Sequence, residues 1–426
     1  MIACAIWQII AHRRFPKDSS IRSGFRRRLG QSVLSARGRR LSNTGKIRVQ
    51  SMQGIYVHIP FCHRKCGYCD FNSYAGMDAL IEPFIEALHR EIEQSPYAGE
   101  RFDTVFFGGG TPTYLSGDAL TGILEHLTRK FDIAPDAEIT CEANPGSVSL
   151  PQLQTMRRAG FNRLSFGVQS FDPDELQRMD RIHSPDDVLQ GVEWARAAGF
   201  TNLNLDLIFA LPKQTVARWE ANLRRAIELQ PEHLSLYALM LEPNTRFYHL
   251  YQKGKLRLPD DETQVAMFCL AQRLAAEAGY RQYEISNYAR AGYECQHNLI
   301  YWRNEPYLGF GPGAVSYMGG KRWTNIKHPR EYIRRVIASE PLELEWERLT
   351  GWDKVAETLM LGLRMLAGVD LAALERRFGL PIRAHYAETI DALIRRGWLE
   401  RDGDTIRLTQ EGLLWHSEVA LAFFDK

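Results

Sequence analysis

Short apolar runs alternate with longer amphipathic stretches from residue 55 to about residue 280, and this alternation constrains the fold more than any other feature. Each run has four to seven residues, the length of a buried strand, and the intervening stretches carry apolar residues at helical spacing. Six such repeats predict an α/β fold with a parallel sheet, because parallel strands need helical crossovers. The pattern alone fits an open sheet and a curved barrel equally. The predicted strands are 55–59, 104–107, 138–141, 163–168, 202–208 and 234–239.

Each of the first five predicted strands ends in polar or glycine-rich residues. Cys62 follows the first strand, a glycine run follows the second, Glu142 follows the third, the fourth ends at Gln169, and Asp206 lies near the end of the fifth. The carboxyl ends of parallel strands meet at one edge of a sheet or one mouth of a barrel. The sequence therefore predicts one site built by several strands.

The alternation stops after residue 280. We divide the chain into residues 1–51, a barrel domain at 52–280, a connecting region rich in Tyr, Trp, Gly and Pro at 281–345, and a mainly helical domain at 346–426. In the last domain, helical patterns precede a hairpin predicted to turn at Asp402-Gly403. This order predicts a winged-helix-like module. Such modules often bind DNA, but the acidic body of this chain favours a packing role.

The net charge of +2 conceals a strong asymmetry along the chain. Residues 1–51 contain twelve of the 53 basic residues and one of the 51 acidic residues, so the remaining chain carries 41 basic and 50 acidic residues. An acidic body does not indicate a nucleic-acid-binding face. No apolar run approaches the roughly 20 residues that a bilayer-spanning helix needs. We therefore expect a cytoplasmic protein without a nucleic-acid partner and without a membrane span.

The first 51 residues are open to two interpretations. Their Arg- and Ser-rich, acid-poor composition suits a mitochondrial transit peptide, which would place the protein in mitochondria. Alternatively, translation starts at Met52, directly before the folded pattern, and the preceding residues are spurious or disordered. We favour the second interpretation. Under both, this extension contributes nothing to the fold.

Three of the seven cysteines, Cys62, Cys66 and Cys69, lie within eight residues in a C-x3-C-x2-C pattern. An odd number of cysteines in a chain of this size does not indicate a disulfide framework. Thiolates are soft ligands that suit zinc or an iron–sulfur cluster. Zinc would need a fourth ligand, such as His63 or a distant cysteine, whereas a cubane held by three thiolates leaves one iron open.

The context of the cysteines resembles the radical S-adenosylmethionine superfamily over roughly residues 54–420. The third cysteine is followed two residues later by Phe71, and Gly108-Gly109-Gly110-Thr111-Pro112 follows the next strand. The resemblance implies a partial (β/α)6, TIM-like barrel, a [4Fe–4S] cluster on the three cysteines and S-adenosylmethionine on the open iron. It further implies that the residues contacting S-adenosylmethionine are Tyr56, Gly109, Gly110, Thr111, Glu142, Gln169, Arg181 and Asp206.

Within the superfamily, the chain resembles the branch that contains oxygen-independent coproporphyrinogen III oxidase and the HemW-type heme chaperones. The segments that carry this resemblance are 56–62, 108–115, 160–165, 167–171 and 206–208. The oxidases have a further cysteine two residues after the third ligand, where this chain has Phe71. They also have an N-terminal arm that residues 1–51 do not resemble. Both departures disfavour porphyrinogen decarboxylation.

The segment His297-Asn298-Leu299-Ile300-Tyr301-Trp302 fits an H-N-x-x-Y-W pattern typical of the heme chaperones. The resemblance implies heme contact by His297, Asn298, Tyr301 and Trp302. A histidine can ligate iron, and aromatic rings can stack on a porphyrin. Cys295 is a second candidate ligand.

We therefore expect a heme chaperone that holds a cluster, S-adenosylmethionine and heme. Its partners would be an unidentified heme-acceptor protein and an electron donor. Two alternatives stay open. The first is an enzyme, a coproporphyrinogen III oxidase that decarboxylates two propionates by hydrogen abstraction. The second is a cluster-bearing interaction module that binds S-adenosylmethionine without cleaving it.

Overall fold

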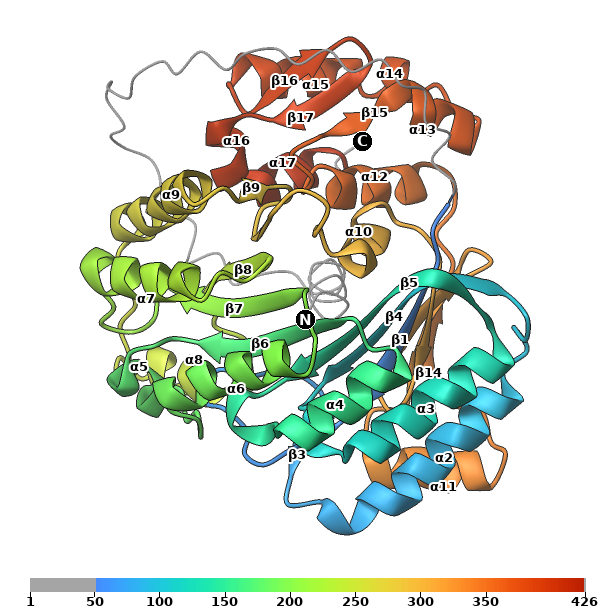
Figure 1. Ribbon diagram of the computed structural model, residues 1–426. Helices are drawn as coiled ribbons and strands as arrows, with labels where there is room; N and C mark the ends of the chain where they lie inside the picture. Colours follow the sequence, from blue (N-terminus) through green and yellow to red (C-terminus); the bar gives the residue numbers. More distant parts are fainter. Residues whose placement is uncertain (1–50, 425–426) are drawn as a thin grey trace. The chain divides into compact units, whose positions relative to one another are not determined.

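The computed structural model describes residues 51–424, so the predictions for the N-terminal extension lie outside the described residues, apart from Ser51. Six parallel strands neighbour one another in sequence order (Figure 1). When every crossover moves the same way along a sheet, all helices fall on one face and the sheet curves. This arrangement confirms the partial (β/α)6 barrel and excludes an open, doubly wound sheet. The strands are β1 (Gly54–Ile59), β4 (Arg101–Gly109), β5 (Asp132–Ala143), β6 (Arg163–Gln169), β7 (Leu203–Phe209) and β8 (His233–Ala238).

Amphipathic helices cover the outer face of this sheet (Figure 1). Their apolar stripes pack on alternate strand residues such as Ile55 and Val57, which are fully buried. Several of these helices begin at a residue whose side chain caps a backbone N–H; Ser116 and Thr215 are examples. The helices are α2 (Ile81–Gln94), α3 (Gly117–Lys130), α4 (Leu150–Ala159), α6 (Pro185–Ala197), α7 (Val216–Glu228) and α9 (Asp261–Glu277). Two short helices, α5 (Pro173–Arg178) and α8 (Arg246–Gln252), belong to a separate apolar cluster that includes Leu176 and Phe247.

The region interpreted from the sequence as a connection extends the sheet at both ends. Beyond β8, the strands β10 (Asn287–Ala289) and β9 (Arg281–Gln282) pair antiparallel. On the other side, β11 (Tyr307–Phe310) runs parallel to β1 and is followed by an antiparallel extension. The remaining elements of the region are α10 (Gln296–Trp302), β12 (Val315–Met318), β13 (Lys321–Asn325), α11 (Pro329–Ile337) and β14 (Glu343–Glu347).

The C-terminal part has a hydrophobic core of its own, around residues such as Leu359 and Ile406. The predicted hairpin is present, but Asp402 pairs with Thr405, so its turn lies at Gly403-Asp404, one residue later than predicted. None of the helices within residues 51–424 combines the length and the apolar character that crossing a membrane requires. The elements here are α12 (Gly351–Gly362), β15 (Val369–Asp370), α13 (Leu371–Phe378), α14 (Ile382–His385), α15 (Ala387–Arg395), β16 (Leu399–Asp402), β17 (Thr405–Leu408), α16 (Gln410–Leu414) and α17 (His416–Ala422).

Candidate functional site

The cysteine loop leaves the carboxyl end of β1 through β2 (Phe61–Cys62) and returns through β3 (Tyr74–Ala75), which pairs with β2. The glycine run at the end of β4 supports the start of this loop. The Gly110 N–H donates to the carbonyl of Ile59 at 2.7 Å, and the Thr111 N–H donates to the carbonyl of Phe61 at 2.8 Å. A Cβ on Gly110 would lie 2.5 Å from that Phe61 carbonyl oxygen, so any larger residue would push the loop away.

Glycine is also required at position 109, because of the backbone conformation there. Its φ is +114°, and a Cβ there would lie 2.6 Å from the ring of His58 on β1. Residues without a Cβ also let a ligand approach the backbone closely. In the structure, Gly109 and Gly110 also allow β4 to pack closely against β1 and the cysteine loop. The two roles are compatible, because the same backbone borders the thiols.

The three thiols are free and partly buried. The hydroxyl of Thr111 lies 3.5 Å from Sγ of Cys62, and Nη1 of Arg181 lies 3.6 Å from Sγ of Cys66. Burial raises the pKa of Cys62 and raises the pKa of Cys69 to about 12. The thiols of Cys62 and Cys69 are therefore protonated at neutral pH without a metal, and ligation would release their protons.

Within residues 51–424, no three His, Cys, Asp or Glu side chains are arranged to hold a single metal ion. The fit of the loop to an iron–sulfur cluster therefore rests on its donor set. Three soft ligands lie on one loop, and the neighbouring hydroxyl of Thr111 and guanidinium of Arg181 can donate to two of the sulfurs. Hydrogen bonds of this kind stabilise the negative charge of a thiolate-ligated cluster.

Arg181 has a spare donor beside the thiols. Its Nη2 donates to the carbonyl of Gly167 at 2.6 Å, while its Nε is buried and has no partner among the described residues. A buried guanidinium N–H without an acceptor suits a carboxylate ligand, because guanidinium and carboxylate form strong, directional pairs. Contact with S-adenosylmethionine, which the sequence resemblance implies for Arg181, fits this geometry, with the methionine carboxylate as the matching group.

Two carboxylates lie inside the barrel, on β5 and β7. Oε2 of Glu142 accepts from the N–H of Gly109 at 3.2 Å, and Asp206 accepts from Ser165 at 3.0 Å and from Asn204 at 2.9 Å. Burial raises the pKa of both carboxylates, and they also repel each other. A cationic ligand would favour their ionised forms. This environment fits the ammonium and sulfonium groups of S-adenosylmethionine.

The two other predicted contact residues, Tyr56 and Gln169, lie on β1 and β6. Tyr56 lies on the face of β1 opposite Ile55 and Val57, and its hydroxyl is 3.1 Å from Nδ1 of His58. Gln169 ends β6 with a φ of 67° after a bulge in the pairing with β7. Such backbone conformations are costly for a residue other than glycine and are concentrated at functional sites.

The four predicted heme residues lie on α10, away from the cysteine loop. Nδ1 of His297 is 2.7 Å from the hydroxyl of Thr104, near the start of β4, and lies beside Gly54, the first residue of β1. The N–H groups of Gln296 and His297 donate to the Glu138 carboxylate. Helix α10 therefore packs at the amino ends of β1 and β4, whereas the thiols follow the carboxyl end of β1.

Both ring nitrogens of His297 have partners, since Nε2 lies 3.0 Å from the hydroxyl of Tyr301. His297 is 1% exposed, and burial lowers its pKa to about 3, so the imidazole is neutral. Trp302 is also buried, beneath the guanidinium of Arg364 at 4.3 Å, and Asn298 is half-buried. Burial raises the pKa of Cys295 to about 12, which makes it a thiol.

Several polar residues inside the barrel were not predicted from the sequence. Arg163, Ser165 and Asn204 are buried on β6 and β7 and point away from the outer core. Their signal was present: polar residues recur at every second position, 163 and 165, then 204 and 206, inside otherwise apolar runs. Glu138, which contacts α10, shows the same alternation with Thr140 and Glu142, whereas Thr104 had no comparable signal.

Comparisons with known proteins place the chain in a known group. Residues 56–226 match the model of the Radical SAM superfamily, and residues 349–415 match that of the HemN C-terminal domain. A Bacillus subtilis protein named heme chaperone HemW is 38% identical over 378 residues, 88% of this chain and 100% of the relative. The Escherichia coli protein of that name is 37% identical over 371 residues, 85% of this chain and 95% of the relative.

A solved structure is also similar over most of its length. It is coproporphyrinogen III oxidase (HemN) from Escherichia coli, described as a radical SAM enzyme. The TM-score is 0.77 at 27% identity, with 88% of this chain and 90% of the other covered.

Proposed function

We propose that this chain, which belongs to the HemW family of heme chaperones within the radical SAM superfamily, binds heme and passes it to an acceptor protein. Membership of the superfamily implies a [4Fe–4S] cluster and S-adenosylmethionine. The observation that carries the proposal is the match to the full length of a curated heme chaperone. Phe71, at the position of the further cysteine expected in the oxidases, supports it.

In this proposal, Cys62, Cys66 and Cys69 ligate three irons of the cluster. When bound, the cluster supplies the electron that cleaves a sulfonium. Thr111 and Arg181 donate to two of the ligand sulfurs, and the spare Nε of Arg181 orients the methionine carboxylate. The electron that reduces the cluster comes from a donor protein, the second partner of the proposal.

Glu142 and Asp206 would form ion pairs with the cationic part of S-adenosylmethionine. Both are held inside the barrel by hydrogen bonds before any ligand arrives, which fixes their orientation. Gln169, Tyr56 and the backbone of the glycine run border the same ligand. The chain's own contribution is to bind and orient this cation while excluding water.

For heme, we propose contact through α10, with His297 as the iron ligand. The neutral imidazole is the form that ligates iron, and burial already keeps His297 neutral. Iron must replace either Tyr301 or Thr104 as the partner of a ring nitrogen. Tyr301 and Trp302 would then supply aromatic contact to the porphyrin, with Asn298 beside them.

A cytoplasmic location is part of the proposal, because the two curated relatives described above are bacterial. A mitochondrial location would require the N-terminal extension to act as a transit peptide, and residues 1–50 lie outside the described part of the chain.

The test is a heme titration of the protein produced from Met52 and reconstituted anaerobically, followed by the Soret band. We expect a near-stoichiometric complex that His297→Ala weakens and that loses its heme to an apo-hemoprotein. His249→Ala, a change at an exposed histidine, is the matched control and should bind heme like the parent. A protein that ignores added heme would refute the proposal.

The alternative function is coproporphyrinogen III oxidation, which the similarity to the solved oxidase over most of both chains favours. An anaerobic assay with coproporphyrinogen III, a reductant and S-adenosylmethionine decides between the two. Formation of protoporphyrinogen IX would establish the oxidase. We expect none.

A further inference from the structure

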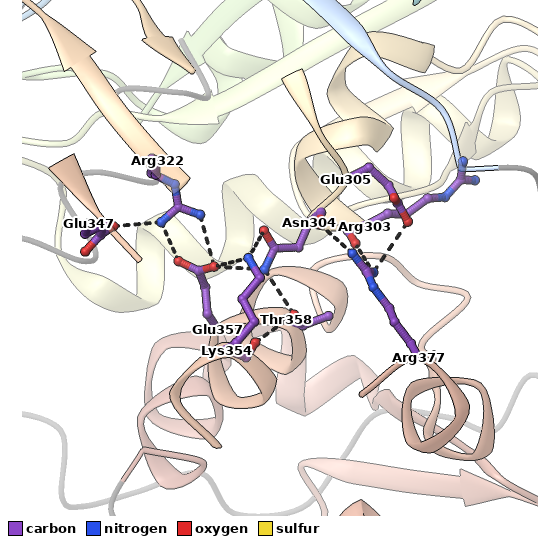
Figure 2. A network of polar contacts seen from close by, with 9 residues as sticks. All are labelled: Arg303, Asn304, Glu305, Arg322, Glu347, Lys354, Glu357, Thr358 and Arg377. Atoms are coloured by element: carbon purple, nitrogen blue, oxygen red, sulfur yellow. Dashed lines mark hydrogen bonds and ion pairs between the residues drawn. The ribbon is translucent and has the colours of Figure 1, made fainter. Parts of the chain in front are cut away.

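The turn that follows α10 is bound by the C-terminal domain (Figure 2). Its central residue is Asn304, which is 2% exposed and has a φ of 54°. Its Nδ2 donates to Oε2 of Glu357 at 2.8 Å and lies 3.0 Å from the hydroxyl of Thr358, and its Oδ1 accepts from Nζ of Lys354 at 2.8 Å. All three partners lie on α12, so one amide side chain ties the end of α10 to the C-terminal domain.

A buried ion network fixes the position of these partners. Arg322 on β13 contacts both oxygens of Glu357, at 2.6 Å and 3.0 Å, and Lys354 contacts Oε2 at 2.9 Å. Burial opposes ionisation of Glu357, but the hydrogen bonds from Arg322 and the charges of both cations outweigh it and lower its pKa to about 2. The carboxylate is therefore ionised at neutral pH. A buried charge set of this kind stabilises one geometry and disfavours intermediate ones.

A second set of contacts binds the same turn from α13. Nη1 of Arg377 donates to the carbonyl of Arg303 at 3.0 Å, and Nη2 donates to the carbonyl of Asn304 at 2.8 Å (Figure 2). Arg377 also pairs with Glu305 at 3.4 Å. Carbonyls at the carboxyl end of a helix lack partners within the helix and attract cations, so these contacts stabilise α10 where it ends.

We propose that this set of contacts is a latch that regulates heme binding by α10. We define the latch as Asn304 with Lys354, Glu357, Thr358 and Arg377. While it is closed, α10 stays at the amino end of the barrel and both ring nitrogens of His297 stay occupied. When the latch opens, the carboxyl end of α10 is released and a ring nitrogen of His297 becomes free to ligate the heme iron. This inference rests on the proposed heme function and adds regulation of the same site.

The latch has a thermodynamic consequence. If heme binds only molecules with the latch open, the observed dissociation constant is the intrinsic one divided by the open fraction. A change that weakens the latch without touching α10 must then tighten heme binding. Without a latch, a change in the C-terminal domain would leave heme binding unaltered or impair it.

The test uses Asn304→Gly in the full chain. Glycine adopts a φ near 54° without strain, so the substitution removes the three side-chain contacts and keeps the backbone path. Asn244→Gly is the matched control, because Asn244 is exposed and has a φ of 68°. We expect faster amide hydrogen exchange over residues 296–303 and a roughly tenfold lower Kd for heme in Asn304→Gly alone.

Two readouts separate the outcomes. Heme affinity that is equal to or weaker than that of the parent overturns the latch, and so does unchanged hydrogen exchange in α10. If parent and variant both fail to bind heme, the proposed function fails and the latch fails with it. Should Asn304→Gly not fold, Arg377→Gln removes the second set of contacts from a partly exposed position and must shift both readouts in the same direction.

Discussion

The Nη1 atom of Arg181 lies 3.6 Å from Sγ of Cys66, while the Nη2 of the same side chain donates to the Gly167 carbonyl at 2.6 Å. One planar guanidinium thus joins the cysteine loop to β6 and leaves its Nε free for a ligand. Lysine cannot reproduce this, because an ammonium is a point charge without the fork of donors.

Arg181→Lys is therefore expected to leave the cluster content unchanged and to lower the affinity for S-adenosylmethionine. The charge beside Cys66 remains, so iron and sulfide content should match the parent protein. Affinity for S-adenosylmethionine, measured by equilibrium binding to the reconstituted protein, should fall roughly 10- to 100-fold, because the directional pair with the carboxylate is lost. Unchanged affinity would remove Arg181 from the binding site.

Cys66→Ser is expected to abolish the cluster. A serine hydroxyl is a hard and weakly acidic ligand, so two thiolates would remain where three are needed. The absorbance at about 400 nm that accompanies a thiolate-ligated cluster should disappear after anaerobic reconstitution. Cys269→Ser, which alters an exposed thiol on α9, is the control and should keep that absorbance. Retained absorbance in Cys66→Ser would show that the ligands lie elsewhere.

Thr111→Val is expected to make the cluster harder to reduce. Its hydroxyl lies 3.5 Å from Sγ of Cys62, and donors to ligand sulfurs raise a cluster's reduction potential by stabilising the added electron. A redox titration followed by electron paramagnetic resonance should give a more negative midpoint. Thr113→Val is the control, since that hydroxyl contacts Ser147 instead. Equal midpoints in all three proteins would show that Thr111 does not act on the cluster.

The ion network predicts a pH dependence of stability. The pKa of Glu357 is about 2 in the folded protein against an ordinary 4.5. Between these values the unfolded chain binds more protons, so stability is present above pH 4.5 and is lost as the pH falls towards 2. Glu357→Gln should lower the free energy of unfolding at pH 7 by on the order of 3 kcal/mol, because it leaves Lys354 buried without its anion and removes one of the two carboxylates that pair with Arg322.

Urea unfolding of parent and variant at pH 7 and at pH 3 measures this effect. The difference between the two proteins should shrink at the lower pH, where the parent has begun to lose the same contribution. Glu220→Gln, in a surface pair with Arg224, should show a difference within about 0.5 kcal/mol at both pH values. A difference for Glu357→Gln that does not change with pH would contradict the assignment.

The sequence predicts those parts of the molecule that follow from local patterns. The six barrel strands follow from apolar runs, and the cysteine loop follows from spacing. The position of α10 does not follow from either, because the contact of His297 with Thr104 joins residues 193 positions apart. The same holds for Asn304 and Glu357, which no periodicity connects. β11 contains a glycine and lies outside the strand–helix alternation, so its four residues carry no distinctive apolar pattern.

The placement of β11 has a consequence for the nascent chain during synthesis. β1 lies inside the sheet, between β4 and β11, yet β11 starts at Tyr307. During vectorial synthesis, the nascent barrel therefore exposes one hydrogen-bonding edge of its first strand until some 250 further residues have left the ribosome, which takes tens of seconds at about 5–20 residues per second. Over that interval the edge is open to pairing with other chains. A trigger of aggregation in this protein is thus expected at β1, and early engagement by a ribosome-associated chaperone would protect it.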